Sequence, residues 1–219
     1  MTIAALEAEA VALIDSAIEQ LERALRAFRS GDARLGRGVV TAARRNRAGA
    51  DGVYESTLAL LGEGSPPAAD VRRRAALLHT VLRIRHIQVE VAAIAQVAED
   101  APAAGDASAA VGAASEQERA LGLMGELTLN RLARARDAFA EHRSELASEM
   151  TATAPELGVV SAPVLVGPAV GVARCLERIE DDAIEIGEQV MFVSSGFFQE
   201  LADSPWLGDG PTRSVVAAP

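Results

Sequence analysis

The feature that most constrains the fold is an apolar stripe with helical spacing at the start of the chain. Its members recur every three or four positions, as Leu6, Ala10, Leu13, Ala17, Leu21 and Leu25, with Ile14 and Ile18 beside them. Such spacing predicts an amphipathic helix that buries one face. The sequence Ser30-Gly31-Asp32 follows, and we expect it to end this helix and cap the next, because glycine suits a helix C-terminus and aspartate an N-terminus.

Further apolar runs are separated by clusters of glycine and proline, and each run predicts another helix. A second helix ends in "LALLGEG", a third covers about 68–98, a fourth about 115–142, and a last one about 169–195. Between the fourth and the last, prolines and glycines make the region 143–167 hard to interpret. The pattern as a whole predicts an all-α fold of six helical segments in two tandem antiparallel three-helix bundles.

The domain boundaries follow from composition. The segment "EDAPAAGDASAA" near the middle of the chain is typical of a linker. We therefore predict a first bundle over 1–100, a linker over 101–108, a second bundle over 109–203 and a loose tail over 204–219.

Composition narrows the class of protein. Aromatic residues make up 3% of the 219 residues, which argues against a β-sandwich or barrel, and a net charge of −10 argues against nucleic acid as the main partner. The single cysteine, Cys175, fits a reducing compartment, and the N-terminus does not resemble a signal peptide. The uncharged stretch 157–173 approaches membrane length, but Pro163 and Pro168 interrupt it, so we interpret it as a helix entry. We therefore expect a cytoplasmic protein.

The most unusual stretch is acidic: six carboxylates lie between Glu177 and Glu188. At about 100° per residue, Glu177, Asp181, Glu185 and Glu188 fall opposite the apolar stripe of this helix. Glu180 falls on the flank and Asp182 nearer the apolar edge. Glu177, Asp181 and Glu185 form a ladder of like charges at i, i+4 and i+8, which destabilises a helix.

Two interpretations of this acidic ladder remain open. It is either a solvated face paired in part to Arg174 and Arg178, or a surface that binds a hard cation, because carboxylate oxygens suit Mg, Ca, Mn or iron. An interior di-iron centre is disfavoured, because most of these acids point outward and the chain has no Glu-x-x-His pair.

The sequence "LERIEDDAIEIGEQVMFVSSG" at 176–196 closely resembles the closing helix signature of PhoU proteins. The matching residues are Leu176, Glu177, Arg178, Ile179, Asp181, Ala183, Ile186, Glu188, Val190 and Gly196. Gly31-Asp32, "PPAADVR" at 66–72 and "LMGEL" at 123–127 resemble other parts of that family. The resemblance implies tandem three-helix bundles and a homodimeric adaptor that damps phosphate uptake and starvation signalling. Its partners would be the ATPase of a phosphate ABC transporter and a sensor histidine kinase, and it would reach the membrane only through them.

The resemblance also implies a metal site, since some PhoU proteins bind iron or another metal on surface ladders, one in each bundle. In the second bundle Glu177 and Asp181 stand at the family's positions, and Glu185 replaces an asparagine. On the preceding helix the nearest candidates for the second ladder are Glu141 and Glu145, with Asp137 as an alternative. We therefore expect at most one metal site, for a divalent metal or iron, in the second bundle.

The first bundle departs from the family pattern. The resemblance places Arg85, Val89 and Ala93 where carboxylates would stand on the third helix, and Ala43 and Arg47 on the second. If these two helices are neighbours, a basic patch is expected, made of Arg44, Arg45, Arg47, Arg83, Arg85 and His86. Such a patch would bind an anion, an acidic partner or another copy, or it would be an ordinary solvated arginine face.

Three functions remain open from the sequence. The first is a phosphate-regulation adaptor without catalytic activity. The second is a scaffold of the same fold that serves another transporter or kinase. The third is a metalloenzyme using the acidic ladder, but no nucleophile or base is evident beside the ladder.

Overall fold

The computed structural model of the protein describes residues 2–62, 64–100, 111–151 and 165–197. These residues form six helices and no strand: α1 (Ile3–Ser30), α2 (Ala33–Leu61), α3 (Ala68–Asp100), α4 (Val111–Glu141), α5 (Ser144–Thr151) and α7 (Pro168–Ser195). The predicted all-α, six-helix fold is confirmed. The predicted linker 101–108 and tail 204–219 lie outside the described residues, so both remain predictions.

Helix ends follow the local signals in the sequence. Gly31 ends α1 with a φ of 63°, and the Asp32 side chain accepts a hydrogen bond of 2.9 Å from the Leu35 amide to cap α2. Gly196 ends α7 with a φ of 77°. The sequence gives no such signal between α4 and α5, where His142 adopts a φ of 53°.

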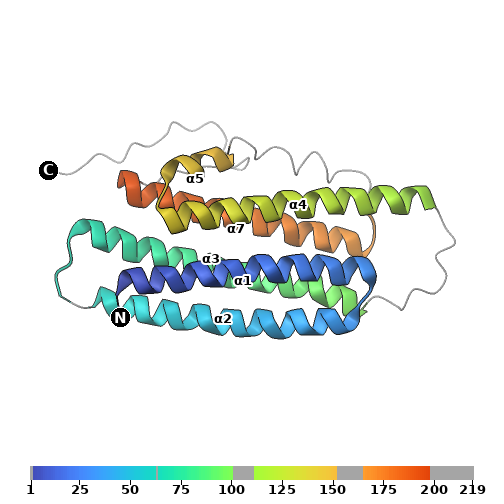
Figure 1. The fold of residues 1–219 in the computed structure, drawn as a ribbon, viewed down its shortest axis with the longest axis horizontal. Helices are drawn as coiled ribbons and strands as arrows, with labels where there is room; N and C mark the ends of the chain where they lie inside the picture. The colour runs from blue at the N-terminus through green and yellow to red at the C-terminus, as the bar shows by residue number, and fades with distance from the viewer. Residues whose placement is uncertain (1, 63, 101–110, 152–164, 198–219) are drawn as a thin grey trace.

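The helices form two bundles that pack side by side (Figure 1). Each of α1, α2 and α3 contacts the other two, as do α4, α5 and α7. The bundles meet where α3 packs against α7 and α1 against α4, both antiparallel, while α2 forms the outermost layer. Gly125 of α4 is part of this contact, because a Cβ there would lie 2.8 Å from Leu25 of α1.

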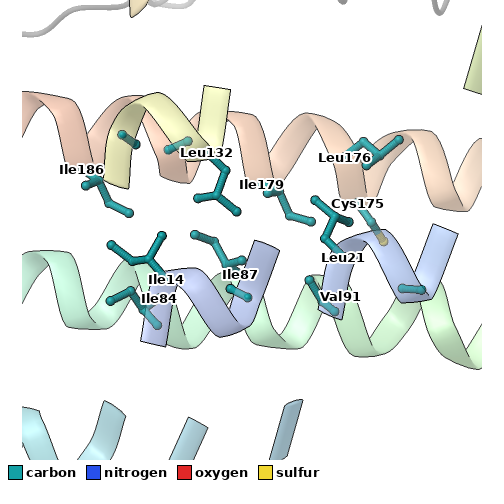
Figure 2. Packing of buried hydrophobic residues seen from close by; sticks show 14 of the residues in the cluster. Ile14, Leu21, Ile84, Ile87, Val91, Leu132, Cys175, Leu176, Ile179 and Ile186 are labelled. Carbon is teal, nitrogen blue, oxygen red and sulfur yellow. The ribbon is translucent and has the colours of Figure 1, made fainter. Parts of the chain in front are cut away.

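The hydrophobic core is continuous across the two bundles. Figure 2 shows side chains of α1 and α3 meeting those of α4 and α7: Ile14, Leu21, Ile84, Ile87 and Val91 on one side, and Leu132, Cys175, Leu176, Ile179 and Ile186 on the other. All of these are buried. The bundles therefore share apolar surface that neither could bury alone.

One end of the molecule gathers the start of α1, the start of α3 and the end of α7. Glu7 of α1 forms a bidentate ion pair with Arg73 of α3, with nitrogen–oxygen distances of 3.1 and 2.5 Å. A Cβ on Gly196 would lie 3.8 Å from the Arg72 guanidinium. The first and last described helices thus begin and end at the same place (Figure 1).

None of the helices in the described ranges has a stretch that is both long and apolar enough to cross a membrane.

Candidate functional site

Two carboxylates of the acidic stretch of α7, Asp182 and Glu185, are paired with basic side chains of α3. Asp182, with a side chain only 3% exposed, has its Oδ2 2.6 Å from Nδ1 of His86 and its Oδ1 3.5 Å from the Arg83 guanidinium. Arg83 also lies 3.1 Å from Glu185. At this interface the positive groups that meet the acidic stretch therefore come from the same chain.

A second buried carboxylate, Glu90 of α3, extends this arrangement. Its Oε1 lies 3.5 Å from Nε2 of His86 and 3.3 Å from the guanidinium of Arg178. Burial, followed by a hydrogen bond to Glu90, raises the pKa of the Cys175 thiol to about 12. We call these groups the α3–α7 charged seam; it comprises Arg83, His86, Glu90, Cys175, Arg178, Asp182 and Glu185.

α7 forms a different buried ion pair on its other side. Glu180 pairs with Arg131 of α4, and both side chains are only 7% exposed.

The interpretation of Glu180 and Asp182 as flank and edge residues agrees with their burial. The interpretation of Glu188 as an exposed acid was wrong, because its residue is 7% exposed. Helices cover α7 on more sides than one amphipathic stripe implies, since α3, α4 and α5 all pack against it.

The acidic ladder itself lies at the edge of this packing. Asp181 is exposed, and Glu177 and Glu185 are half-buried. Partial burial, followed by repulsion from Glu177 and Glu185, raises the pKa of Asp181. The ladder carboxylates are therefore close enough to interact, as their spacing indicated. The interpretation that paired the ladder with Arg178 was wrong. Arg178 pairs with Glu90 of α3 instead.

The carboxylates proposed for a second ladder, Glu141, Glu145 and Asp137, lie away from the acidic ladder of α7 along the bundle axis. α4 and α7 run in the same direction, and the pairing of Arg131 with Glu180 sets their relative position (Figure 1). Ten residues on, Glu141 lies near the level of residue 190, roughly 13 Å beyond Asp181 at 1.5 Å per residue. Its carboxylate is 3.1 Å from Arg143, while Asp137 is 2.6 Å from Arg136 and Glu145 is exposed on α5.

In the described part of the chain, no three His, Cys, Asp or Glu side chains converge in a way that could hold a metal ion. The arrangement of these residues thus does not fit a site with ligands from two helices. The metal site at Glu177, Asp181, Glu185, Glu141 and Glu145 stays a prediction.

The predicted basic patch is only partly present. α2 and α3 are neighbours, as that prediction requires. However, Arg83 and His86 face the acids of α7, and Arg85 pairs with Asp51 of α2 at 2.8 Å. The other three arginines of the predicted patch, all on α2, are exposed: Arg44, Arg45 and Arg47.

Solved structures share this arrangement of helices. PhoU from Pseudomonas aeruginosa superposes with a TM-score of 0.78, covering 88% of this chain and 96% of that protein at 19% sequence identity. The phosphate transport system regulatory protein PhoU from Streptococcus pneumoniae gives a TM-score of 0.71, covering 90% and 97%, also at 19% identity. The chain has the PhoU fold. No protein-family model and no curated protein sequence matches it.

Several contacts of this PhoU fold could not be inferred from one helix at a time. The seam pairs His86 and Glu90 with α7, and the buried Arg131–Glu180 pair joins α4 to α7. One signal was available: Arg83 and His86 belong to the basic patch predicted on the third helix, and these two residues meet Asp182 of α7.

We expect the pairing at Asp182 to make stability depend on pH. Burial raises the pKa of Asp182 to about 6, although His86 and Arg83 act to lower it. Since the ordinary value is 3.8, the folded state holds this proton more tightly than the unfolded state. The resulting stabilisation is present below about pH 4 and is lost as pH rises through about 6.

The measurement is urea unfolding of wild type and Asp182→Asn at pH 4.5, 6 and 7.5. Relative to the variant, the wild type should lose up to roughly 2 kcal/mol over this range. Asp51→Asn is the matched control, because Asp51 is 46% exposed and pairs at the surface. Parallel pH profiles for wild type and Asp182→Asn would contradict the expected link.

The metal prediction can be tested on the ladder alone. Without metal, Asp181→Ala should be no less stable than wild type at neutral pH, because the fold disfavours the ionised Asp181 carboxylate. Millimolar Mn²⁺ should raise the Tm of wild type by mass action, and Asp181→Ala should lose that gain. Glu55→Ala, which removes an exposed acid of α2, should keep it. Equal gains in all three proteins would mean that the ladder is a solvated face.

Proposed function

We propose that this protein is a PhoU-like adaptor, without catalytic activity of its own, that restrains phosphate uptake and phosphate-starvation signalling. One observation carries the proposal. The superposition on a solved PhoU spans both bundles and covers 96% of that protein. The helix whose sequence carries the PhoU signature, α7, also lies at the centre of the second bundle and of the contact between bundles.

The proposed partners are the ATPase subunit of a phosphate ABC transporter and a sensor histidine kinase. The proposed setting is the cytoplasm, with the protein acting as a homodimer. The α3–α7 charged seam and the Arg131–Glu180 pair support a structural role for the acids of α7, because Asp182, Glu180 and Glu185 are paired within the molecule. Regulation would then depend on exposed surfaces of a fixed double bundle.

The test is deletion of the gene in the native host, with phosphate uptake and starvation-gene expression measured in phosphate-rich medium. We expect both to rise, and reintroduced wild type to restore them. Affinity capture from phosphate-rich cells should recover a phosphate transporter ATPase. If phosphate physiology is unchanged and the capture recovers a different transporter or kinase, the protein is a PhoU-fold scaffold for that system instead.

A further inference from the structure

Charge is unevenly distributed between one helical hairpin and the rest of the chain. Residues 23–50 contain eight arginines and a single acid, Asp32. This segment carries +7, so the remainder of a chain with a net charge of −10 carries −17. The segment covers about the last quarter of α1 and the first two-thirds of α2.

These eight arginines take no part in the ion pairs that the described residues form. Most of those pairs use arginines of α3, α4 and α7: Arg73, Arg83, Arg85, Arg131, Arg136 and Arg178. No ion pair among the described residues involves any of the eight, and all are exposed: Arg23, Arg26, Arg29, Arg34, Arg37, Arg44, Arg45 and Arg47. Asp32 is occupied in capping α2. We call this surface the arginine face.

The geometry of α2 concentrates the charge on one side. At about 100° per residue, Arg34, Arg37, Arg44 and Arg45 fall within an arc of roughly 100° opposite the buried positions of the helix. α2 is the outermost helix, so this arc points away from both bundles (Figure 1). From Arg34 to Arg45 the row is about 16 Å long.

α1 adds to the same surface. The Arg23 guanidinium lies 3.6 Å from the position that a Cβ on Gly38 would occupy, so the arginines of α1 adjoin those of α2. Glu19 and Glu22 precede Arg23 and Arg26 by four residues and offset them in part. The arginines of α2 carry the strongest uncompensated charge.

The shape and composition of the face select its partner. Most of it lies along α2, the outermost helix, and Arg29 of α1 also lines a cleft of about 90 Å³. It also lacks large apolar anchors, because the exposed ones in the described ranges lie elsewhere, at Leu58, Val71, Val89, Leu123, Val166 and Phe197. A protein interface with a buried centre would need such anchors.

We propose that the arginine face docks the protein on membrane surfaces rich in anionic phospholipid headgroups. Guanidinium groups bind phosphate and carboxylate oxygens through paired hydrogen bonds, and a flat anionic surface can meet all the arginines of the row at once. The rest of the chain carries a charge of −17 and is repelled by an anionic membrane. The protein therefore approaches the membrane with this face. This inference is independent of the proposed role in phosphate regulation.

The test is co-sedimentation of the full chain with vesicles of phosphatidylcholine containing 30% phosphatidylserine, at low salt. Wild type should bind these vesicles, release them at 0.5 M salt and fail to bind pure phosphatidylcholine. The variant R34Q/R37Q/R44Q should bind about 100-fold more weakly, from roughly a fivefold loss for each arginine. Inorganic phosphate at constant ionic strength should not compete.

The control variant loses the same number of positive charges outside the arginine face. R134Q/R143Q/R174Q removes three exposed arginines of α4, α7 and the turn before α5, and should bind like wild type. Circular dichroism checks that both variants fold. Absence of wild-type binding, or equal loss in the two variants, would overturn the proposal. So would competition by free phosphate, or binding to duplex DNA or RNA in preference to the vesicles.

Discussion

Replacing Arg131 with Met should destabilise the protein by about 3–5 kcal/mol, the largest effect expected from a single change to its charged groups. The substitution leaves the Glu180 carboxylate in a site where the side chain is 7% exposed, without the guanidinium that it faces. It also removes the positive charge that lowers the pKa of Asp181. Chemical denaturation at pH 7.5, with circular dichroism as the signal, measures the free energy of unfolding.

Two variants make this result specific. Arg131→Met combined with Glu180→Leu should recover most of the loss, because an apolar pair of similar volume carries no buried charge. Arg136→Met removes an arginine of the same helix whose ion pair with Asp15 is about 40% exposed, and should change stability by about 1 kcal/mol or less. A loss in Arg131→Met no larger than that in Arg136→Met would show that the Glu180 pair is not buried in solution.

The second large effect is expected at the contact between bundles. Ile179→Ala should lower the free energy of unfolding by about 2–5 kcal/mol, because Ile179 is fully buried among residues of both bundles (Figure 2). Since the core is continuous, unfolding should remain one cooperative transition, with both bundles lost together.

The matched control is Val89→Ala, an apolar truncation on α3 where the residue is 44% exposed, and it should stay within about 0.5 kcal/mol of wild type. Urea titrations followed by circular dichroism would compare the stabilities of the two variants with wild type. Calorimetry of wild type would show whether both bundles unfold in one transition. Two separated transitions in wild type, or equal stability of the two variants, would contradict a shared core.

Helix positions and burial along each helix could be predicted from the sequence because both depend on local spacing. On α1 the stripe from Leu6 to Leu25 is buried except for the partly buried Leu13 and Ile18, and Gly31 and Gly196 end their helices as expected. Helical angles also placed Glu180 and Asp182 nearer the apolar side than Asp181, and both are buried while Asp181 is exposed.

The partners of the acidic stretch could not be predicted in this way, because they depend on how two distant helices align. His86 and Asp182 are 96 positions apart and meet at 2.6 Å only because α3 and α7 run antiparallel in one particular register. A single amphipathic stripe also assumes one buried face. For Glu188 that assumption failed, since α7 packs against helices on several sides.

The shared location of the chain's two described ends has a mechanical consequence. α1 starts where α7 finishes, near Arg72 and Arg73 at the start of α3. A pulling force applied through residues 2 and 197 would therefore act at one end of the double bundle, across the helices rather than along them. Contacts would break turn by turn instead of shearing all at once. In a force-spectroscopy experiment the protein should open at low force, and attachment points at opposite ends of α2 should require a higher one.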